Sequence, residues 1–243
     1  TRKMDVPTQN VHYADREGNT LYQMSGQIPV RRVDGAVVRG DRVFDGSAGE
    51  AEWEGFEPFG SSSWEGFIPF EEKPSVRNAD WLATANQRTA DDPTYPIGNV
   101  FASGFRATRI EEAFREALAD GSIDREFARQ LQTDTLSVRA RLLVPAILDA
   151  RDRMPDEAAE WLDALDDWDY RMDPDSAAAL VFSHFLDAFR EATWADDFEA
   201  AGLDDSYWPQ EWVLATLPPD SEFFDGDRAA VLAEAMGTAV ETI

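Results

Sequence analysis

Few side chains of this chain belong to the types that most often carry out chemistry in proteins. Its 243 residues include no cysteine, which excludes disulfides, thiolate zinc sites and cysteine nucleophiles. His12 and His184 are the only histidines, too few for a histidine-rich metal centre. Because His12 falls in a predicted strand and His184 near the apolar face of a predicted helix, we interpret both as packing residues.

A second chemical feature is an aromatic repeat. The unit W-E-G-F-x-P-F begins at Trp53 and again at Trp64. Two copies do not make a solenoid, which needs at least three repeats to bury a continuous core. Exposed Trp and Phe rings could form a platform for a sugar or another flat ligand. Loops of this composition also fold over the core of their own domain, and the residues alone leave both interpretations open.

The chain is strongly acidic. Its 22 Lys and Arg residues against 48 Asp and Glu residues give a formal net charge of −26 at pH 7. This excess of carboxylates repels nucleic-acid phosphates and anionic membranes, so we expect neither as a partner. An aromatic content of 12% supplies core material, which argues against a disordered acidic protein. Because salt screens self-repulsion, such a surface indicates a halophilic protein.

The elements that must position any site fall into two parts. Residues 1–102 are predicted to be β-rich, with a hairpin around residues 15–19, strand-like pieces at 35–44 and a short run at 81–86. Residues 103–243 are predicted to be mostly helical. The expected features there are a helix ending at Gly121, a second helix capped by Ser122, a third with a kink at Pro145, and helices at 156–167, 175–193 and 226–242. A β-rich part followed by an α-rich part predicts an α+β fold.

Six short segments occur in a specific order between about residues 5 and 145. They are Tyr13–Asn19, Gly26–Arg31, Trp64–Pro74, Thr84–Arg88, Arg106–Ile110 and Leu131–Ser137. In this order they resemble the motifs Y-A-D-x-x-G-N, G-x-x-P-x-R, W-x-G-x-I-P-F-E-E-x-P, x-A-N-N-R, R-x-x-R-I and L-Q-x-D-x-x-S of the penicillin amidase family of N-terminal nucleophile hydrolases. The second copy of the repeat is then the family motif, and the first copy is a local insertion or duplication. The resemblance implies that residues 1–102 form part of an αββα catalytic sandwich.

The resemblance also implies a mechanism. Enzymes of this family cleave amide bonds with an N-terminal serine whose own α-amine serves as the base. Asn86 matches the asparagine whose side-chain amide stabilises the oxyanion, together with a backbone N–H. Arg109 matches an arginine that orients the site and assists maturation, and Gln9 lies near the wall of the acyl pocket. From the residues alone, Asn86 could instead cap a turn, and Arg109 could pair with Glu111 or Glu112.

The sequence departs from the family pattern in two respects. Gln87 stands where the family usually has a second asparagine, and we interpret the adjacent Arg88 as a structural ion-pair partner. The serine nucleophile and the segment that follows it are not found, and Thr1 lies too close to the Tyr13 hairpin to replace them. We therefore expect a fragment of an amidohydrolase that is inactive alone. Its expected partners are the remainder of the acylase, meaning the α chain and the N-terminal part of the β chain, and a small N-acyl substrate of the penicillin or acyl-homoserine-lactone type.

No cofactor is expected, and no metal ligands are assigned. The resemblance implies a structural calcium ion near the active-site strands, but the pair Asp91–Asp92 is the kind of local cluster that any chain with 48 acidic residues contains. Family members usually act outside the cytoplasm, which implies an extracytoplasmic location. The alternative is a non-catalytic, acidic interaction module whose Trp-rich loop binds a protein or glycan; it explains the missing nucleophile but not the order of the motifs.

Overall fold

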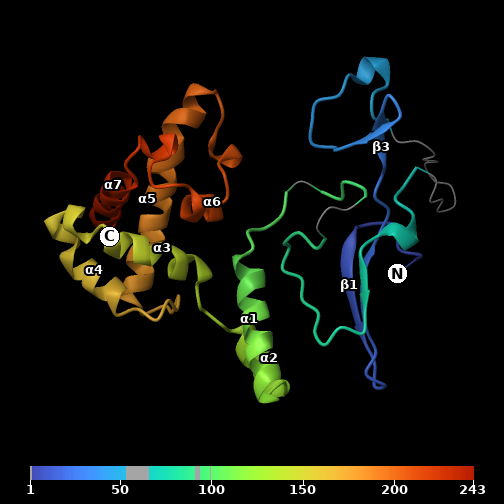
Figure 1. Cartoon of the computed structure of the whole chain (residues 1–243), viewed down its shortest axis with the longest axis horizontal. Coiled ribbons are helices and arrows are strands. Elements are labelled where there is room, and N and C mark those ends of the chain that lie inside the picture. Colours follow the sequence, from blue (N-terminus) through green and yellow to red (C-terminus); the bar gives the residue numbers. More distant parts are fainter. Residues whose placement is uncertain (1, 53–65, 91–93, 99) are drawn as a thin grey trace. The chain divides into compact units, whose positions relative to one another are not determined.

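The computed structural model describes residues 2–52, 66–90, 94–98 and 100–243 (Figure 1). The chain forms two compact units, Thr1–Ala102 and Ser103–Ile243. Short strands and loops build the first unit and helices build the second, which confirms the predicted α+β fold. Several predicted features lie outside the described residues, namely Thr1, the first copy of the aromatic repeat, the start of the second copy at Trp64, and Asp91–Asp92.

The first unit contains a three-stranded antiparallel sheet in the order β1-β2-β5. Strands β1 (Gln9–Ala14) and β2 (Thr20–Ser25) form the predicted hairpin, and β5 (Ser75–Arg77) pairs with the other edge of β2. The Asp15 carboxylate closes the hairpin turn, because its Oδ1 accepts the backbone N–H of Asn19 at 2.8 Å. This contact gives a physical role to the Asp and Asn of the Y-A-D-x-x-G-N segment.

A second, two-stranded sheet consists of β3 (Arg31–Val33) and β4 (Ala36–Val38). The strands are joined by Asp34 and Gly35, with φ values of 51° and 79°. Two consecutive residues with positive φ match the right-handed twist of the flanking strands, which is why Asp-Gly is a common hairpin turn. The remaining regular elements of this unit are two short 3-10 helices, η1 (Gly46–Ala48) and η2 (Phe70–Glu72).

The core of the first unit forms where two of the motif segments pair. Ile68 N–H donates to the Ile28 carbonyl at 2.9 Å, and Val30 N–H donates to the Gly66 carbonyl at 2.9 Å. This pairing brings apolar side chains of both segments against β2, where an alternating strand face buries them. The buried cluster consists of Tyr22, Met24, Ile28, Val30 and Ile68, with Val37, Leu82, Tyr95 and Ile97 packed against it.

The predicted strand at residues 81–86 is absent, since the structure has no strand among residues 79–90. A strand needs a neighbour that accepts its hydrogen bonds. The described residues supply such a neighbour only as far as β5, where Leu21 pairs with Arg77. The segment beyond Asn78 therefore runs as irregular backbone over the sheet, and this segment carries Asn86.

The second unit is helical. Its α-helices are α1 (Phe105–Asp120), α2 (Arg125–Gln132), α3 (Val138–Asp149), α4 (Ala159–Asp166), α5 (Ala177–Ala200), α6 (Glu211–Thr216) and α7 (Arg228–Thr242). Short 3-10 helices lie between them, namely η3 (Arg151–Arg153), η4 (Asp156–Ala158), η5 (Asp205–Tyr207) and η6 (Glu222–Phe224). Helix α3 continues through Pro145. No helix in the described part of the chain is long and apolar enough to cross a membrane.

Local capping chemistry sets the ends of α1 and α2. Gly121 adopts φ 67° after α1, as predicted for a left-handed C-terminal cap. The predicted N-cap of α2, Ser122, is wrong. Asp124 is the cap, and its side chain accepts the Phe127 N–H at 2.8 Å. Ser122 instead completes the end of α1, because its N–H donates to the Ala117 carbonyl at 2.9 Å.

The core of the second unit surrounds α5. Phe182, Phe185 and Phe189 lie on one stripe of this helix and are almost completely buried. The Phe189 ring stacks on Phe224 of η6 with centroids 5.9 Å apart, which joins α5 to the segment preceding α7. Trp194, fully buried, continues the stripe by contacting Phe223 at 5.0 Å. Burial of this aromatic stripe is the main physical reason that the long helix stays anchored.

Candidate functional site

Asn86 lies on an exposed bend in the first unit. Its φ of 63° is in the left-handed region, which costs little for asparagine compared with most residues but is still uncommon. The Ala102 N–H holds the bend by donating to the Asn86 carbonyl at 2.8 Å. The preceding residue, Ala85, is only 3% exposed and anchors the bend in the protein. The bend therefore presents a polar residue on an exposed, fixed backbone.

Gln87 supports this bend. Its side-chain Oε1 accepts the Ala85 N–H at 2.6 Å, which ties the two residues on either side of Asn86 together. The glutamine that replaces the second asparagine of the family pattern thus has a structural role here. A residue held in an uncommon backbone conformation by contacts on both sides is the kind of position at which functional groups are found.

A hollow of about 280 Å³ lies on one side of this segment, lined by residues of the sheet and of 81–89. The His12 ring meets the edge of the Tyr22 ring at 5.8 Å, and its Nε2 is 3.5 Å from the Thr84 hydroxyl. The Tyr22 hydroxyl donates to Asn10 Oδ1 at 2.8 Å, and burial raises the pKa of Tyr22, which keeps this donor protonated. His12 is exposed, so its predicted role as a packing residue is limited to this edge contact.

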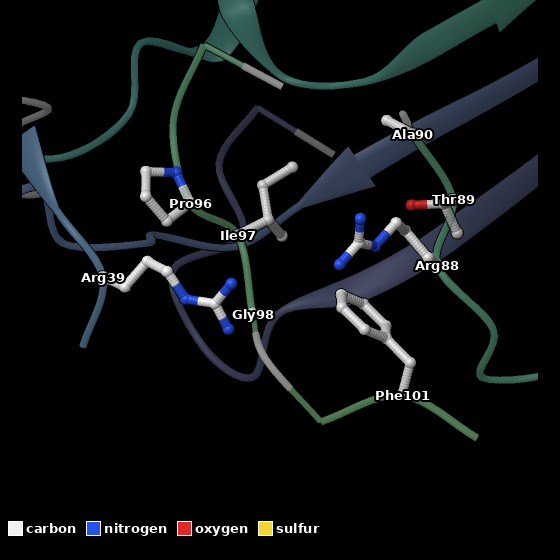
Figure 2. A pocket seen from close by; sticks show the side chains of 8 residues that line it. All are labelled: Arg39, Arg88, Thr89, Ala90, Pro96, Ile97, Gly98 and Phe101. Carbon is white, nitrogen blue, oxygen red and sulfur yellow. The ribbon is translucent and has the colours of Figure 1, made fainter. Parts of the chain in front are cut away.

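A second hollow, of about 290 Å³, is lined by the later part of the same segment (Figure 2). Arg88, Thr89 and Ala90 line it together with Arg39 and residues 96–98 and 101. Arg88, interpreted above as an ion-pair partner, makes a different contact. Its guanidinium carbon lies 5.5 Å from the centroid of the Phe101 ring.

Gln9 is the first residue of β1 and is exposed. In the register of the sheet it stands opposite Ser25, and its carbonyl accepts the Ser25 hydroxyl at 3.3 Å. The side chain of Gln9 makes no hydrogen bond with Asn86 among the interactions of the described residues. Gln9 and Asn86 therefore belong to the same unit but not to one hydrogen-bonded cluster.

Arg109 belongs to the second unit, where it forms a bidentate ion pair. Its Nε lies 3.1 Å from Asp134 Oδ1 and its Nη2 lies 2.7 Å from Asp134 Oδ2. The two side chains are only 17% and 14% exposed. The hydrogen bonds from Arg109 lower the pKa of Asp134, and the same contact raises the pKa of Arg109. The ion-pair partner is thus Asp134, and not Glu111 or Glu112 as in the alternative interpretation, and the contact joins the R-x-x-R-I and L-Q-x-D-x-x-S segments.

A groove of about 450 Å³ follows this ion pair along the start of α1 and α3. Apolar side chains such as Phe105, Ile110 and Met172 line it beside Arg106 and Arg109. The Arg139 guanidinium lies over the Phe105 ring at 5.9 Å, and its Nη1 pairs with Glu211 at 3.1 Å. Asp134 pairs with Arg109 and Glu211 pairs with Arg139, so the groove combines apolar side chains with paired charges.

Lys73 is a buried cation that the sequence analysis did not single out. Its residue is 3% exposed, and its Nζ donates to the Gly26 carbonyl. Burial lowers the pKa of the Lys73 ammonium to about 8. A single lysine carries no periodicity, and only its place between the E-E and P of the motif could have drawn attention to it.

No group of three or more His, Cys, Asp or Glu side chains arranged to hold a metal ion occurs among residues 2–52, 66–90, 94–98 and 100–243. The pair Asp91–Asp92 lies outside these ranges. The implied calcium ion therefore stays an expectation without assigned ligands. The sequence Asn86-Gln87-Arg88 puts two neutral amides and one cation on a single segment, and groups of these types can stabilise negative charge.

Comparisons with known proteins agree with the resemblance drawn from the motifs. A family model described as penicillin amidase matches residues 1–243. A solved structure of a thermostable penicillin G acylase from Alcaligenes faecalis is similar to this chain, with a TM-score of 0.57 and 18% sequence identity. The similarity covers 94% of this chain and 45% of that chain, so this chain spans less than half the length of the acylase. At this identity the likeness shows a shared fold.

Proposed function

The chain belongs to the penicillin amidase family, and we propose that it forms part of an amidohydrolase that cleaves N-acyl amide bonds. The observation that supports this activity best is the presentation of Asn86 on an exposed bend at φ 63°. Two hollows are lined by neighbouring residues of the segment that carries it, Thr84 and Gln87 in one and Arg88 in both, so a substrate has room close to this segment. A side chain that donates to the oxyanion has to be accessible to the substrate, and an exposed bend makes this possible.

Amide hydrolysis builds negative charge on the carbonyl oxygen when a nucleophile attacks the carbonyl carbon. In the proposed mechanism the nucleophile is an N-terminal serine outside this sequence, whose α-amine accepts the hydroxyl proton. The Asn86 side-chain N–H₂ donates to the oxyanion, and no proton has to move to it or from it. A donor that is already oriented costs no reorganisation during the reaction, which is why its effect on turnover is large.

The finer parts of the proposal concern partners and substrates. The remainder of the acylase would supply the nucleophile, so the 243-residue chain alone is expected to be inactive. Penicillins and acyl-homoserine lactones are both N-acyl amides and both fit this chemistry. Gln9 would border the acyl pocket, and Arg109, held by Asp134, would orient the site. The protein would act outside the cytoplasm.

The alternative of a non-catalytic interaction module rests on the aromatic repeat. Most of that repeat lies outside the described residues, whereas the penicillin amidase model matches residues 1–243. The enzyme is therefore the function that the observations favour.

The experiment that tests the proposal replaces Asn86 by alanine in the complete protein. We expect the turnover of a phenylacetyl amide to fall by about 10²–10³, which is the usual cost of losing one oxyanion donor, with little change in KM. Asn78→Ala is a matched control, because Asn78 is also an exposed asparagine of the first unit at positive φ, 53°. Full turnover in Asn86→Ala, or an equal loss in both variants, would exclude Asn86 as the donor.

A further inference from the structure

The hollow of Figure 2 has a composition that the proposed mechanism does not use. The Arg39 and Arg88 side chains reach into it from opposite sides, and Ile97 lies between them with Phe101 beside Arg88 (Figure 2). Pro96 adds to the apolar wall. The hollow therefore combines two guanidinium groups with an apolar surface large enough for a small organic group.

Both arginines have donors available in this hollow. Within the described part of the chain, no carboxylate lies within ion-pair distance of Arg88, whose contact is with the Phe101 ring. Arg39 binds Asp41 through Nε and Nη2, at 3.1 Å and 2.7 Å, which leaves its Nη1 group unused by that pair. Arg88 is thus the stronger attractor for an anion, and Arg39 is a partly neutralised second donor.

These two cations stand out because of the charge of the whole chain. A formal net charge of −26 repels an approaching anion, so an anionic ligand needs a local cluster of cations to bind. A planar carboxylate matches the donor geometry of a guanidinium group and can accept two parallel hydrogen bonds from it. The apolar wall would cover the carbon atoms next to such a carboxylate.

The hollow is also tied to the bend that presents Asn86. Arg88 follows Asn86 by two positions, and Phe101 precedes Ala102, whose N–H donates to the Asn86 carbonyl at 2.8 Å. The two residues joined by this hydrogen bond are therefore close in sequence to two residues that line the hollow. The segment that carries Asn86 also supplies Arg88 to the hollow.

We propose that the hollow between Arg39 and Arg88 binds a carboxylate of the amide substrate. The substrate class is then N-acyl compounds that carry a carboxylate close to the amide, such as N-acyl amino acids, in preference to neutral amides. The assignment of the ligand as a substrate rests on the proposed function, but binding of the carboxylate can be measured without catalysis.

The binding test uses the full 243-residue chain and a matched pair of probes, N-phenylacetylglycine and the uncharged N-phenylacetylglycinamide. Ligand-observed NMR should show that the acid binds about tenfold more tightly than the amide, since a hydrogen bond to a charged group contributes about that much. Arg88→Gln should abolish the difference. Arg42→Gln is the control, because Arg42 also lies over a phenylalanine ring, 5.1 Å from Phe44, and does not line this hollow.

Equal binding of the two probes to the unaltered chain would overturn the inference without any variant. An unchanged difference in Arg88→Gln, with its circular dichroism spectrum intact, would overturn it as well. In the complete protein, Arg88→Gln should raise KM about tenfold for N-phenylacetylglycine and leave both kcat and the hydrolysis of the neutral amide unchanged. If Arg88→Gln leaves KM for N-phenylacetylglycine unchanged while Asn86→Ala loses turnover as expected, only the carboxylate site is contradicted. If Asn86→Ala keeps full turnover, the proposed function itself is contradicted.

Discussion

The buried residue Lys73 is expected to make the stability of this protein depend on pH. Its ammonium group is nearly inaccessible and donates to the Gly26 carbonyl, next to a glycine that the fold requires. Gly26 has φ 86°, and a Cβ added there would lie 2.6 Å from Thr8 Cα. The lysine therefore caps a backbone carbonyl at a point where the chain passes very close to itself.

The lowered pKa of Lys73 predicts a definite pH dependence of stability. Its folded-state pKa is about 8, below the unfolded value of about 10.4, so between these pH values the unfolded chain binds more protons than the folded chain. The free energy of unfolding should therefore rise from pH 8 to pH 10 by an amount that Lys73→Met lacks. Urea unfolding of both proteins at several pH values measures this difference, and parallel curves would contradict the lowered pKa.

At the scale of elements, the Arg109–Asp134 pair connects α1 to the segment between α2 and α3. Asp134 also accepts the Leu136 N–H at 2.9 Å, just before Ser137 caps α3 by accepting the Ala140 N–H. One carboxylate thus fixes the side chain of one helix and the backbone leading into another. These contacts give physical roles to both the Asp and the Ser of the L-Q-x-D-x-x-S segment.

We expect Asp134→Asn to destabilise the second unit by about 2 kcal/mol at pH 7, because it leaves a mostly buried guanidinium without its counter-charge. The effect should be complete above the unfolded-state pKa of about 4 and disappear as the pH falls through the lower folded-state pKa of Asp134. Glu126→Gln is the control, since its pair with Arg129 is exposed and should contribute little. Chemical unfolding at pH 7 and below pH 4 checks both statements, and equal effects of the two variants would contradict the first.

Local sequence patterns predicted turns and helix ends better than they predicted which distant segments or side chains contact one another. The Asp15 turn and the Gly121 cap follow from side-chain chemistry within a few residues, so the hairpin and the end of α1 could be predicted. The strand expected at 81–86 was a wrong prediction. A local pattern cannot show whether a strand has a hydrogen-bonding neighbour, because that neighbour is far away in the sequence. The same limit applies to the candidate site. The motif indicated Asn86 as a candidate, but no local pattern could predict the ion pair between Arg109 and Asp134, which lie 25 positions apart.

At the scale of the whole molecule, charge is the dominant property. The 48 acidic residues greatly outnumber the 22 basic ones. Among the described residues, ion pairs such as Arg115–Glu111, Arg129–Glu126 and Arg153–Asp227 involve exposed side chains of modest individual value. Net repulsion among surface carboxylates should therefore exceed the attraction within pairs. The same repulsion makes the two arginines of the hollow between Arg39 and Arg88 more important for anion binding than they would be in a neutral protein.

Because net repulsion is expected to exceed the attraction within ion pairs, we predict that salt stabilises the protein. The Debye length falls from about 10 Å at 0.1 M to about 3 Å at 1 M, so long-range repulsion should be screened before close ion pairs are weakened. We expect the thermal midpoint to rise with KCl, with much of the gain below about 0.5 M, and NaCl should act equally at equal ionic strength. Differential scanning fluorimetry, followed through the tryptophans, measures the midpoint. A midpoint that is flat or falls over this range would mean that paired charges outweigh the net repulsion, and a gain found only at molar salt would indicate exclusion of salt from the surface instead of screening.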